Sequence, residues 1–204
     1  LPFVSGERRE LLRPPFLRIT MEEAFQKGAG FSLAEAAEGG TRGSAGGILE
    51  DEARRLGIEP PPGLSAAELY DLIFIHAVEP SLPRDKPAAI LDYPAFVPVL
   101  AKKKAPSGPR SGAWVERWEL YIDGIELANC FSEEQDPAAV RSFFRSEGAE
   151  KAAGALVPHA VDPRCWETFK DFPRCSGAAL GLDRLIMAFL EKSSIDGVLP
   201  FPLT

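Results

Sequence analysis

The most constraining feature of this 204-residue chain is a run of small side chains that ends in an arginine. Residues 175–184 read Cys-Ser-Gly-Ala-Ala-Leu-Gly-Leu-Asp-Arg, and an apolar helical pattern follows from Asp183 to Glu191. A strand with so little side-chain volume adds little to a core, but it lets a flat ligand lie close to the backbone. Arg184 adds a planar guanidinium at the positive end of the following helix. The run therefore predicts a nucleotide site without a Walker-type phosphate loop.

Composition narrows the class of protein. The net charge of −7 argues against a broad surface for nucleic acid, although it leaves room for a local basic cleft. Three cysteines without Cys-x-x-Cys spacing indicate a reduced intracellular protein, and two histidines make a His-rich zinc site improbable. The longest apolar run, Leu72 to Val78, is too short to cross a bilayer. We expect a cytoplasmic protein with no membrane partner.

Residues 1–86 have mostly helical patterns, and we expect them to form a helical insertion region. Three hydroxyl residues precede a glutamate at the capping-box spacing: Thr20 with Glu23, Ser32 with Glu35, and Ser65 with Glu68. The Gly-rich stretch 38–47 lacks the lysine and hydroxyl of a phosphate loop, so it predicts a flexible loop.

Residues 87–204 have strand patterns. Ala88 to Tyr93 reads as a buried strand, and Trp114 to Asn129 as a hairpin that turns at Asp123-Gly124. Asp136-Pro137 is a helix start signal. We therefore predict an α+β fold, in which an antiparallel sheet is flanked by helices and joined to the helical insertion, as part of a larger catalytic domain.

Acidic residues recur along the hairpin. Period-two alternation places Glu119 and Glu126 on the face opposite the packed side chains, near one another across the ladder. Two facing carboxylates repel each other unless a cation separates them, and Mg²⁺ with nucleotide phosphates is a natural bridge. The alternative is that both are solvent-facing strand residues. Farther along, Asn129, Phe131 and Glu133 alternate in a way that suits a ligand with an ammonium group.

Two stretches, Tyr121 to Glu133 and Gly177 to Arg184, resemble the lysine-specific branch of class II aminoacyl-tRNA synthetases, and the second is similar to their motif 3. The resemblance is closest to the shortened lysyl-tRNA synthetase paralogue that attaches lysine or β-lysine to elongation factor P. It extends over residues 17–204 and implies the C-terminal half of the catalytic domain.

The resemblance also implies roles for matching residues. Glu126 and Arg184 are implied to be catalytic and to bind ATP, and the Leu127 backbone and Gly181 are implied to lie beside the nucleotide. Glu119 and Glu126 are implied to coordinate Mg²⁺. The amino-acid pocket is formed by four residues, Asn129, Phe131, Glu133 and Ala179. The implied reaction is attack of the amino-acid carboxylate on the α-phosphate, which gives an aminoacyl-adenylate and pyrophosphate.

The chain departs from the family pattern in three places. Ala179 stands where lysyl-tRNA synthetases have glycine, and its methyl group favours a β-amino acid by about 1–3 kcal/mol. Cys130 replaces a glycine and is strained if that position requires a positive φ. Nothing resembles motif 1, which builds the dimer, or motif 2, whose arginine binds the α-phosphate. We therefore expect this chain alone to be inactive and the full-length protein to be a homodimer.

Two other functions fit the same residues. One is a part of a lysyl-tRNA synthetase that charges tRNA(Lys). The other is a non-catalytic paralogue that kept the fold as a binding or regulatory module.

Overall fold

The computed structural model of the protein describes residues 4–38, 44–105, 113–154, 156–157, 162 and 164–202. Its elements in chain order are α1 (Gly6–Leu11), β1 (Leu17–Thr20), α2 (Met21–Gly28), α3 (Leu33–Ala37), α4 (Ala45–Arg55), α5 (Ala66–Ile73), the π-helix η1 (Phe74–Val78), the 3-10 helix η2 (Glu79–Ser81), β2 (Ala88–Pro94), β3 (Trp114–Ile122), β4 (Ile125–Ser132), α6 (Pro137–Gly154), the 3-10 helix η3 (Cys165–Asp171), β5 (Ser176–Leu180), α7 (Leu182–Leu190) and the 3-10 helix η4 (Ile195–Gly197).

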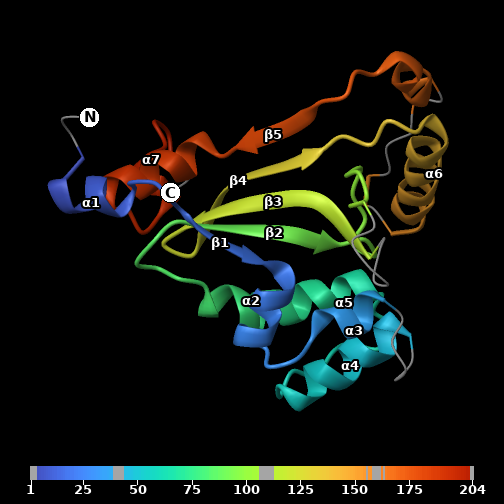
Figure 1. Ribbon diagram of the computed structural model, residues 1–204, viewed down its shortest axis with the longest axis horizontal. Coiled ribbons are helices and arrows are strands. Elements are labelled where there is room, and N and C mark those ends of the chain that lie inside the picture. The colour runs from blue at the N-terminus through green and yellow to red at the C-terminus, as the bar shows by residue number, and fades with distance from the viewer. Residues whose placement is uncertain are drawn as a thin grey trace.

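Five strands form one sheet in the order β1-β2-β3-β4-β5 (Figure 1). The four strands from β2 to β5 are antiparallel neighbours, as the sequence predicts. β1 is an unpredicted addition that pairs in parallel with β2, from Leu17 opposite Ala88 to Thr20 opposite Leu91. The predicted α+β class is therefore confirmed, with a mixed sheet flanked by helices.

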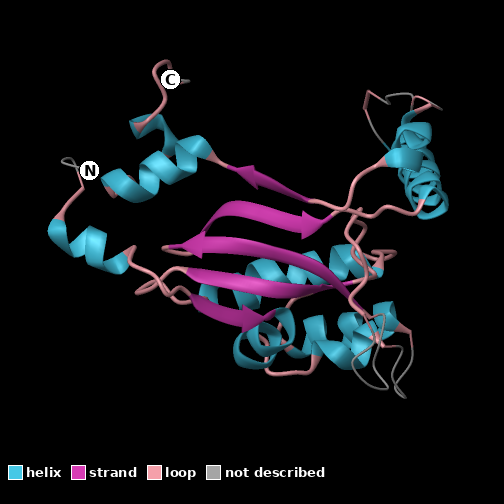
Figure 2. Ribbon diagram, turned by 45° about the horizontal axis from the view of Figure 1, so that its top comes forward, coloured by secondary structure: helices cyan, strands magenta, loops and turns pink. Residues whose placement is uncertain are grey.

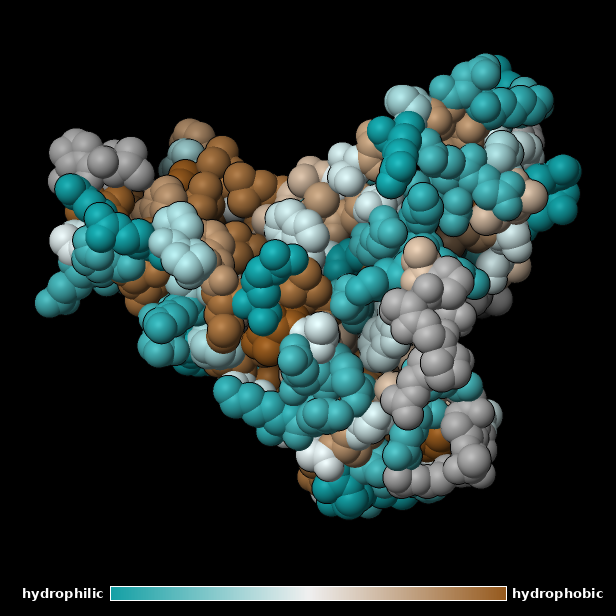
Figure 3. Space-filling model, viewed as in Figure 1, coloured by the Kyte–Doolittle hydropathy of each residue, from teal (hydrophilic) through white to brown (hydrophobic). Residues whose placement is uncertain are grey.

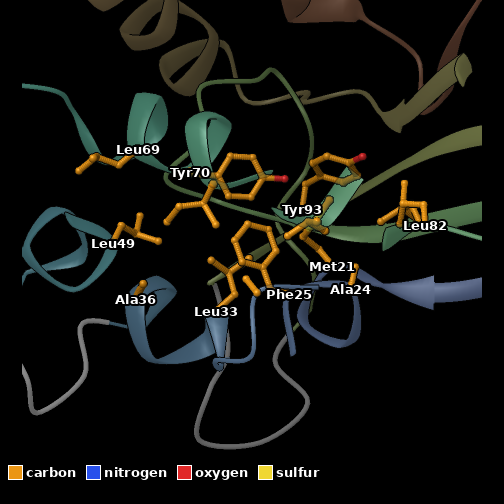
Figure 4. Packing of buried hydrophobic residues seen from close by; sticks show 14 of the residues in the cluster. Met21, Ala24, Phe25, Leu33, Ala36, Leu49, Leu69, Tyr70, Leu82 and Tyr93 are labelled. Carbon is orange, nitrogen blue, oxygen red and sulfur yellow. The ribbon is translucent and has the colours of Figure 1, made fainter. Parts of the chain in front are cut away.

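Helices α2 to α5 gather beside the β1 and β2 side of the sheet (Figures 1 and 2). Their apolar faces meet in a core where the rings of Phe25 and Tyr70 stack with centroids 5.2 Å apart (Figure 4). Met21, Leu33 and Ile73 are fully buried around them. Each such side chain contributes about 1.5–3 kcal/mol when it leaves water. This core fixes the helices to one end of the sheet face and leaves β4 and β5 uncovered by them.

The helix starts follow the sequence with one exception. Thr20 and Ser65 form two of the three predicted capping boxes, at α2 and α5. Ser32 does not cap α3 through its own side chain, so that prediction is wrong. Instead, Glu22 on α2 accepts hydrogen bonds from the Ser32 hydroxyl at 2.8 Å and from the Ala34 amide at 2.7 Å. A carboxylate from a neighbouring helix therefore satisfies this helix end.

The Gly-rich stretch is only in part a loop. Residues 39–43 lie outside the described residues. Ser44 caps α4, accepting a hydrogen bond from the Gly47 amide at 3.3 Å, so Gly46 and Gly47 belong to its first turn. The loop prediction is wrong for these two glycines, because a well-placed N-cap outweighs their low helix propensity.

A buried arginine connects α1, α7 and the turn between β3 and β4. Arg8 on α1 is 5% exposed, and its guanidinium donates to the carbonyl of Ala188 on α7 at 2.6 Å. It also donates to both carboxylate oxygens of Asp123, in the turn between β3 and β4, at 3.1 and 2.5 Å. Asp123 holds a left-handed φ of 55°, as the predicted turn requires. Arg8 thus fixes the hairpin tip relative to α7.

Over the described stretches, no helix combines the length and apolar character needed to cross a membrane.

Candidate active site

The register of the β3–β4 hairpin differs from the predicted one. Glu126 pairs with Tyr121, as a two-residue turn at Asp123-Gly124 gives, but Glu119 pairs with Asn129 because the register shifts between Leu120 and Tyr121. The two glutamates are therefore not directly opposite each other, but they are diagonal neighbours across the ladder, which agrees with the predicted proximity. Both still lie on one face, since Tyr121 alternates with Glu119 on β3. Glu126 lies at the end of the sheet where α7 begins, beside Arg184.

Glu126 meets Arg184 there. The Arg184 guanidinium donates to the Glu126 carbonyl oxygen at 2.9 Å and lies 3.7 Å from its carboxylate. The two side chains are 52% and 34% exposed. An ion pair this open contributes at most about 1 kcal/mol. It leaves both charged groups accessible to a ligand.

The backbone beside this pair is fixed by one hydrogen bond. The Gly181 amide donates to the Leu127 carbonyl at 2.8 Å, and Gly181 forms the N-cap of α7. A Cβ at Gly181 would lie 3.5 Å from the Leu127 oxygen and 3.5 Å from the Arg184 side chain, which is ordinary contact. The predicted nucleotide residues Glu126, Leu127, Gly181 and Arg184 therefore lie together. Their roles toward ATP stay predictions.

A third carboxylate belongs to this end of the site. The pKa of Glu79, on η2, is raised first by burial and then by the negative charges of Glu126 and Glu119. Arg184 opposes that effect. Sequence reasoning assigned no role to Glu79. Carboxylates whose charges disfavour one another suit a divalent cation, which removes the repulsion and prefers oxygen ligands.

Glu119 is held more tightly than a solvent-facing residue. It is 6% exposed, and it accepts hydrogen bonds from Arg117 at 2.5 Å and from the Tyr121 hydroxyl at 2.9 Å. Burial, and next the Glu119 charge, raise the pKa of Tyr121. The Arg117 guanidinium also lies 4.5 Å from the ring centre of Tyr93. The metal role of Glu119 stays a prediction. In the part of the chain that the structure describes, no three His, Cys, Asp or Glu side chains form a metal-binding group.

The predicted amino-acid pocket lies farther along the same face. Asn129 pairs with Ala179, and Phe131 pairs with Gly177. The Glu133 carboxylate covers Gly177 so closely that a Cβ there would lie 2.2 Å from its Oε1 atom. The four predicted residues therefore line one strip, but Glu133 is about 13 Å of strand away from the Gly181 end. Sequence reasoning missed this contact between Glu133 and Gly177.

Cys130 does not distort this strip. It sits in regular strand geometry, paired with Trp118 and Ala178, and is absent from the non-glycine residues that have positive φ in the described chain. The expected strain is therefore not found. Alternation places its thiol on the opposite face from Asn129. Burial, and secondarily the Glu133 charge, raise the pKa of Cys130, which favours the unreactive thiol.

Comparison with known proteins gives one consistent result. A family model described as tRNA synthetases class II (D, K and N) matches residues 4–204. Lysine–tRNA ligase of Moorella thermoacetica is 35% identical over 97% of the chain and 38% of its own length. The enzymes with that name from Anaeromyxobacter sp. strain K and Prochlorococcus marinus are both 36% identical over 94% of the chain. Of their own lengths, 38% and 36% are matched, so the chain spans little more than a third of these relatives. This chain belongs to the class II tRNA synthetase family for D, K and N.

Proposed function

We propose that this chain contributes one half of an active site that activates lysine or β-lysine with ATP. The observation that carries the proposal is the single sheet face that joins Glu126 and Arg184 at one end to Glu133 at the other. The Arg184 guanidinium and the carboxylates beside it suit a triphosphate with Mg²⁺. The Glu133 carboxylate and the Asn129 amide suit an amino acid that has two ammonium groups.

The residues act by position and charge. Arg184 neutralises phosphate charge, and its place at the start of α7 adds the positive end of the helix dipole. Glu126 and Glu79 would hold Mg²⁺, which supplies charge neutralisation on the phosphates. Asn129 and Glu133 orient the ammonium groups, so that the carboxylate of the amino acid points toward the Arg184 end. Nothing in this arrangement requires a covalent enzyme intermediate.

For the acceptor, we propose elongation factor P. Ala179 supports it, because its methyl group lies on the pocket floor opposite Asn129 and favours a β-amino acid. Charging of tRNA(Lys) is the second candidate, which the names of the similar proteins favour. The test uses the chain joined to an upstream segment that supplies the α-phosphate-binding arginine, incubated with ATP, radiolabelled lysine or β-lysine, and each acceptor separately. Label on elongation factor P supports the first candidate, and label only on tRNA(Lys) overturns it.

Activation itself is tested by ATP–pyrophosphate exchange. We expect no exchange from this chain alone, and lysine-dependent exchange once a segment that supplies the α-phosphate-binding arginine is joined upstream. In that active form, Glu126→Gln lowers exchange about 100-fold or more. Glu133→Gln raises the amino-acid KM about 10-fold or more, because it removes the negative charge of the pocket. Gly177→Ala raises the KM by a similar factor, because its methyl group displaces the Glu133 carboxylate.

Glu116→Gln is the matched control. Glu116 lies on β3 but alternates with Arg117 and therefore belongs to the other face of the sheet. It is expected to leave exchange unchanged. Exchange by the unaided chain would contradict its predicted inactivity. Equal kinetics for Glu116→Gln and Glu133→Gln would overturn the proposed pocket.

A further inference from the structure

A cavity with a volume of about 470 Å³ lies between α6 and η3. Figures 1 and 2 show α6 at one end of the sheet and α7 at the other. The amino-acid activation proposed above uses none of the residues that line this cavity. Six of them bear on what it can bind: Arg141, Ser142, Arg145, Trp166, Glu167 and Lys170.

The charge of this cavity is opposite to that of the chain. Arg141, Arg145 and Lys170 bring three positive charges against the single carboxylate of Glu167, although the chain carries a net charge of −7. All three cations are exposed, and none forms an ion pair with another residue in the described part of the chain. Cations that are gathered, exposed and not neutralised attract an anionic ligand.

The aromatic ring of the cavity already has a partner. The Arg141 guanidinium lies 5.5 Å from the ring centre of Trp166, which is half-buried on η3. This contact orients the planar guanidinium, and it occupies the ring on which a nucleobase would have to stack. Trp166 is also the only aromatic residue among the described residues that line the cavity. The ring therefore supports an anion-binding arginine, and the cavity suits carboxylates better than nucleic acid.

The spacing of the cations matches the carboxylates of an extended peptide. Arg141 and Arg145 are one helical turn apart on α6, with Cβ atoms about 5–6 Å from each other. Alternate side chains of an extended peptide lie about 7 Å apart on one side of its backbone. Two such carboxylates can each accept two parallel hydrogen bonds from one guanidinium. Lys170 lies across the cavity on η3 and can bind a third carboxylate, so a short acidic segment fits better than one small anion.

We propose that the α6–η3 cavity binds an acidic segment of a partner protein, in an extended conformation with carboxylates at alternate positions. Recognition of acidic motifs by clusters of arginine is a recurring mode of peptide binding. Ser142 lines the same cavity, and its hydroxyl can donate a hydrogen bond to a carbonyl or carboxylate oxygen of the segment. This inference does not rest on the proposed amino-acid activation, and its test uses neither ATP nor an amino acid.

The test measures binding of a fluorescein-labelled peptide dodecamer of alternating glutamate and serine by fluorescence anisotropy. The chain is expected to bind this peptide more weakly as salt rises, because the cations are exposed. Arg141→Gln/Arg145→Gln is expected to weaken binding at least 10-fold, since two charged contacts are lost. Trp166→Leu is expected to weaken binding about 2- to 5-fold, because Arg141 loses the ring that orients it. A dodecamer of alternating glutamine and serine is expected not to bind.

The control, Arg13→Gln/Arg54→Gln, removes two exposed arginines elsewhere, on or beside α1 and α4, with the same change in charge. Circular dichroism verifies that each variant is folded. An equal loss of binding in the control would show that net charge alone acts, and would overturn the proposal. So would no binding by the unmodified chain, or equal binding of the glutamine peptide. A single-stranded RNA of matched charge that bound more tightly than the glutamate peptide, with the same dependence on Arg141 and Arg145, would also overturn it.

Discussion

The carboxyl group of Glu79 couples the stability of the fold to pH. Its pKa is raised above 4.5, chiefly by burial and then by the charges of Glu126 and Glu119. The folded chain therefore holds this proton at pH values where the unfolded chain, with a pKa near 4.5, has released it. Because the folded state binds more protons in that window, the Glu79 contribution to stability is lost as pH rises from 4.5 through the raised pKa.

Replacing Glu79 by glutamine removes this cost. We expect Glu79→Gln to be more stable than the unmodified chain at pH 8, and the difference to vanish below about pH 4, where the carboxyl is protonated in both states. Urea denaturation midpoints at a series of pH values measure the difference.

Glu23→Gln provides a control of opposite sign. Hydrogen bonds from the Thr20 amide and hydroxyl lower the pKa of Glu23, so its contribution to stability is present above pH 4.5 and is lost as pH falls. We therefore expect Glu23→Gln to be less stable than the unmodified chain at high pH. A Glu79→Gln variant that follows the unmodified chain at every pH would show that the pKa of Glu79 is not raised in the folded chain.

At the scale of elements, the close approach of α2 to η1 and η2 positions Glu79. A Cβ on Gly28 would lie 2.8 Å from the Val78 Cα atom and 2.9 Å from the Ala77 carbonyl oxygen. Backbone atoms cannot move aside as a flexible side chain can, so Gly28→Ala is expected to destabilise the fold by about 1–3 kcal/mol.

The matched variant is Gly46→Ala in α4, where a Cβ meets nothing within 4 Å. Alanine has the better helix propensity, so this change is expected to stabilise the fold by about 0.5–1 kcal/mol. Chemical denaturation compares the two. If both glycines gave the same sign, the helix-to-helix contact would not be what keeps Gly28 small.

The sequence predicts those elements and site residues whose determinants are local. Period-two alternation predicts β3, β4 and the shared face of Asn129, Phe131 and Glu133. It does not predict the register irregularity near Leu120, because alternation does not record an extra residue. Nor does the sequence predict that Glu79 lies near Glu126, since only tertiary packing brings η2 to the hairpin. The division at residues 86 and 87 stays a prediction.

At the scale of the whole molecule, one edge of the sheet is uncovered. β5 is the last strand in the sheet order, and in the described chain nothing pairs with its outer side. Leu180 and Leu182, at its end, are 56% and 63% exposed. Hydrophobic residues also gather over α7 and the adjoining end of β5 (Figure 3). An open edge beside exposed leucines is a typical site of association between chains.

We therefore expect this chain to self-associate through β5 and the start of α7. Sedimentation velocity should show an average mass that rises with concentration, because unpaired strand edges and apolar side chains gain from mutual burial. Leu180→Lys/Leu182→Lys is expected to hold the chain monomeric, since burying two unpaired charges at the edge outweighs the gain. Ile75→Lys is the control: Ile75 is 57% exposed but lies on η1, beside α2 and α5. If Ile75→Lys abolished association and the leucine variant did not, the contact between chains would lie on the surface formed by η1, α2 and α5, and not at β5. A chain that remains monomeric at every concentration would show that the open edge is protected without a partner.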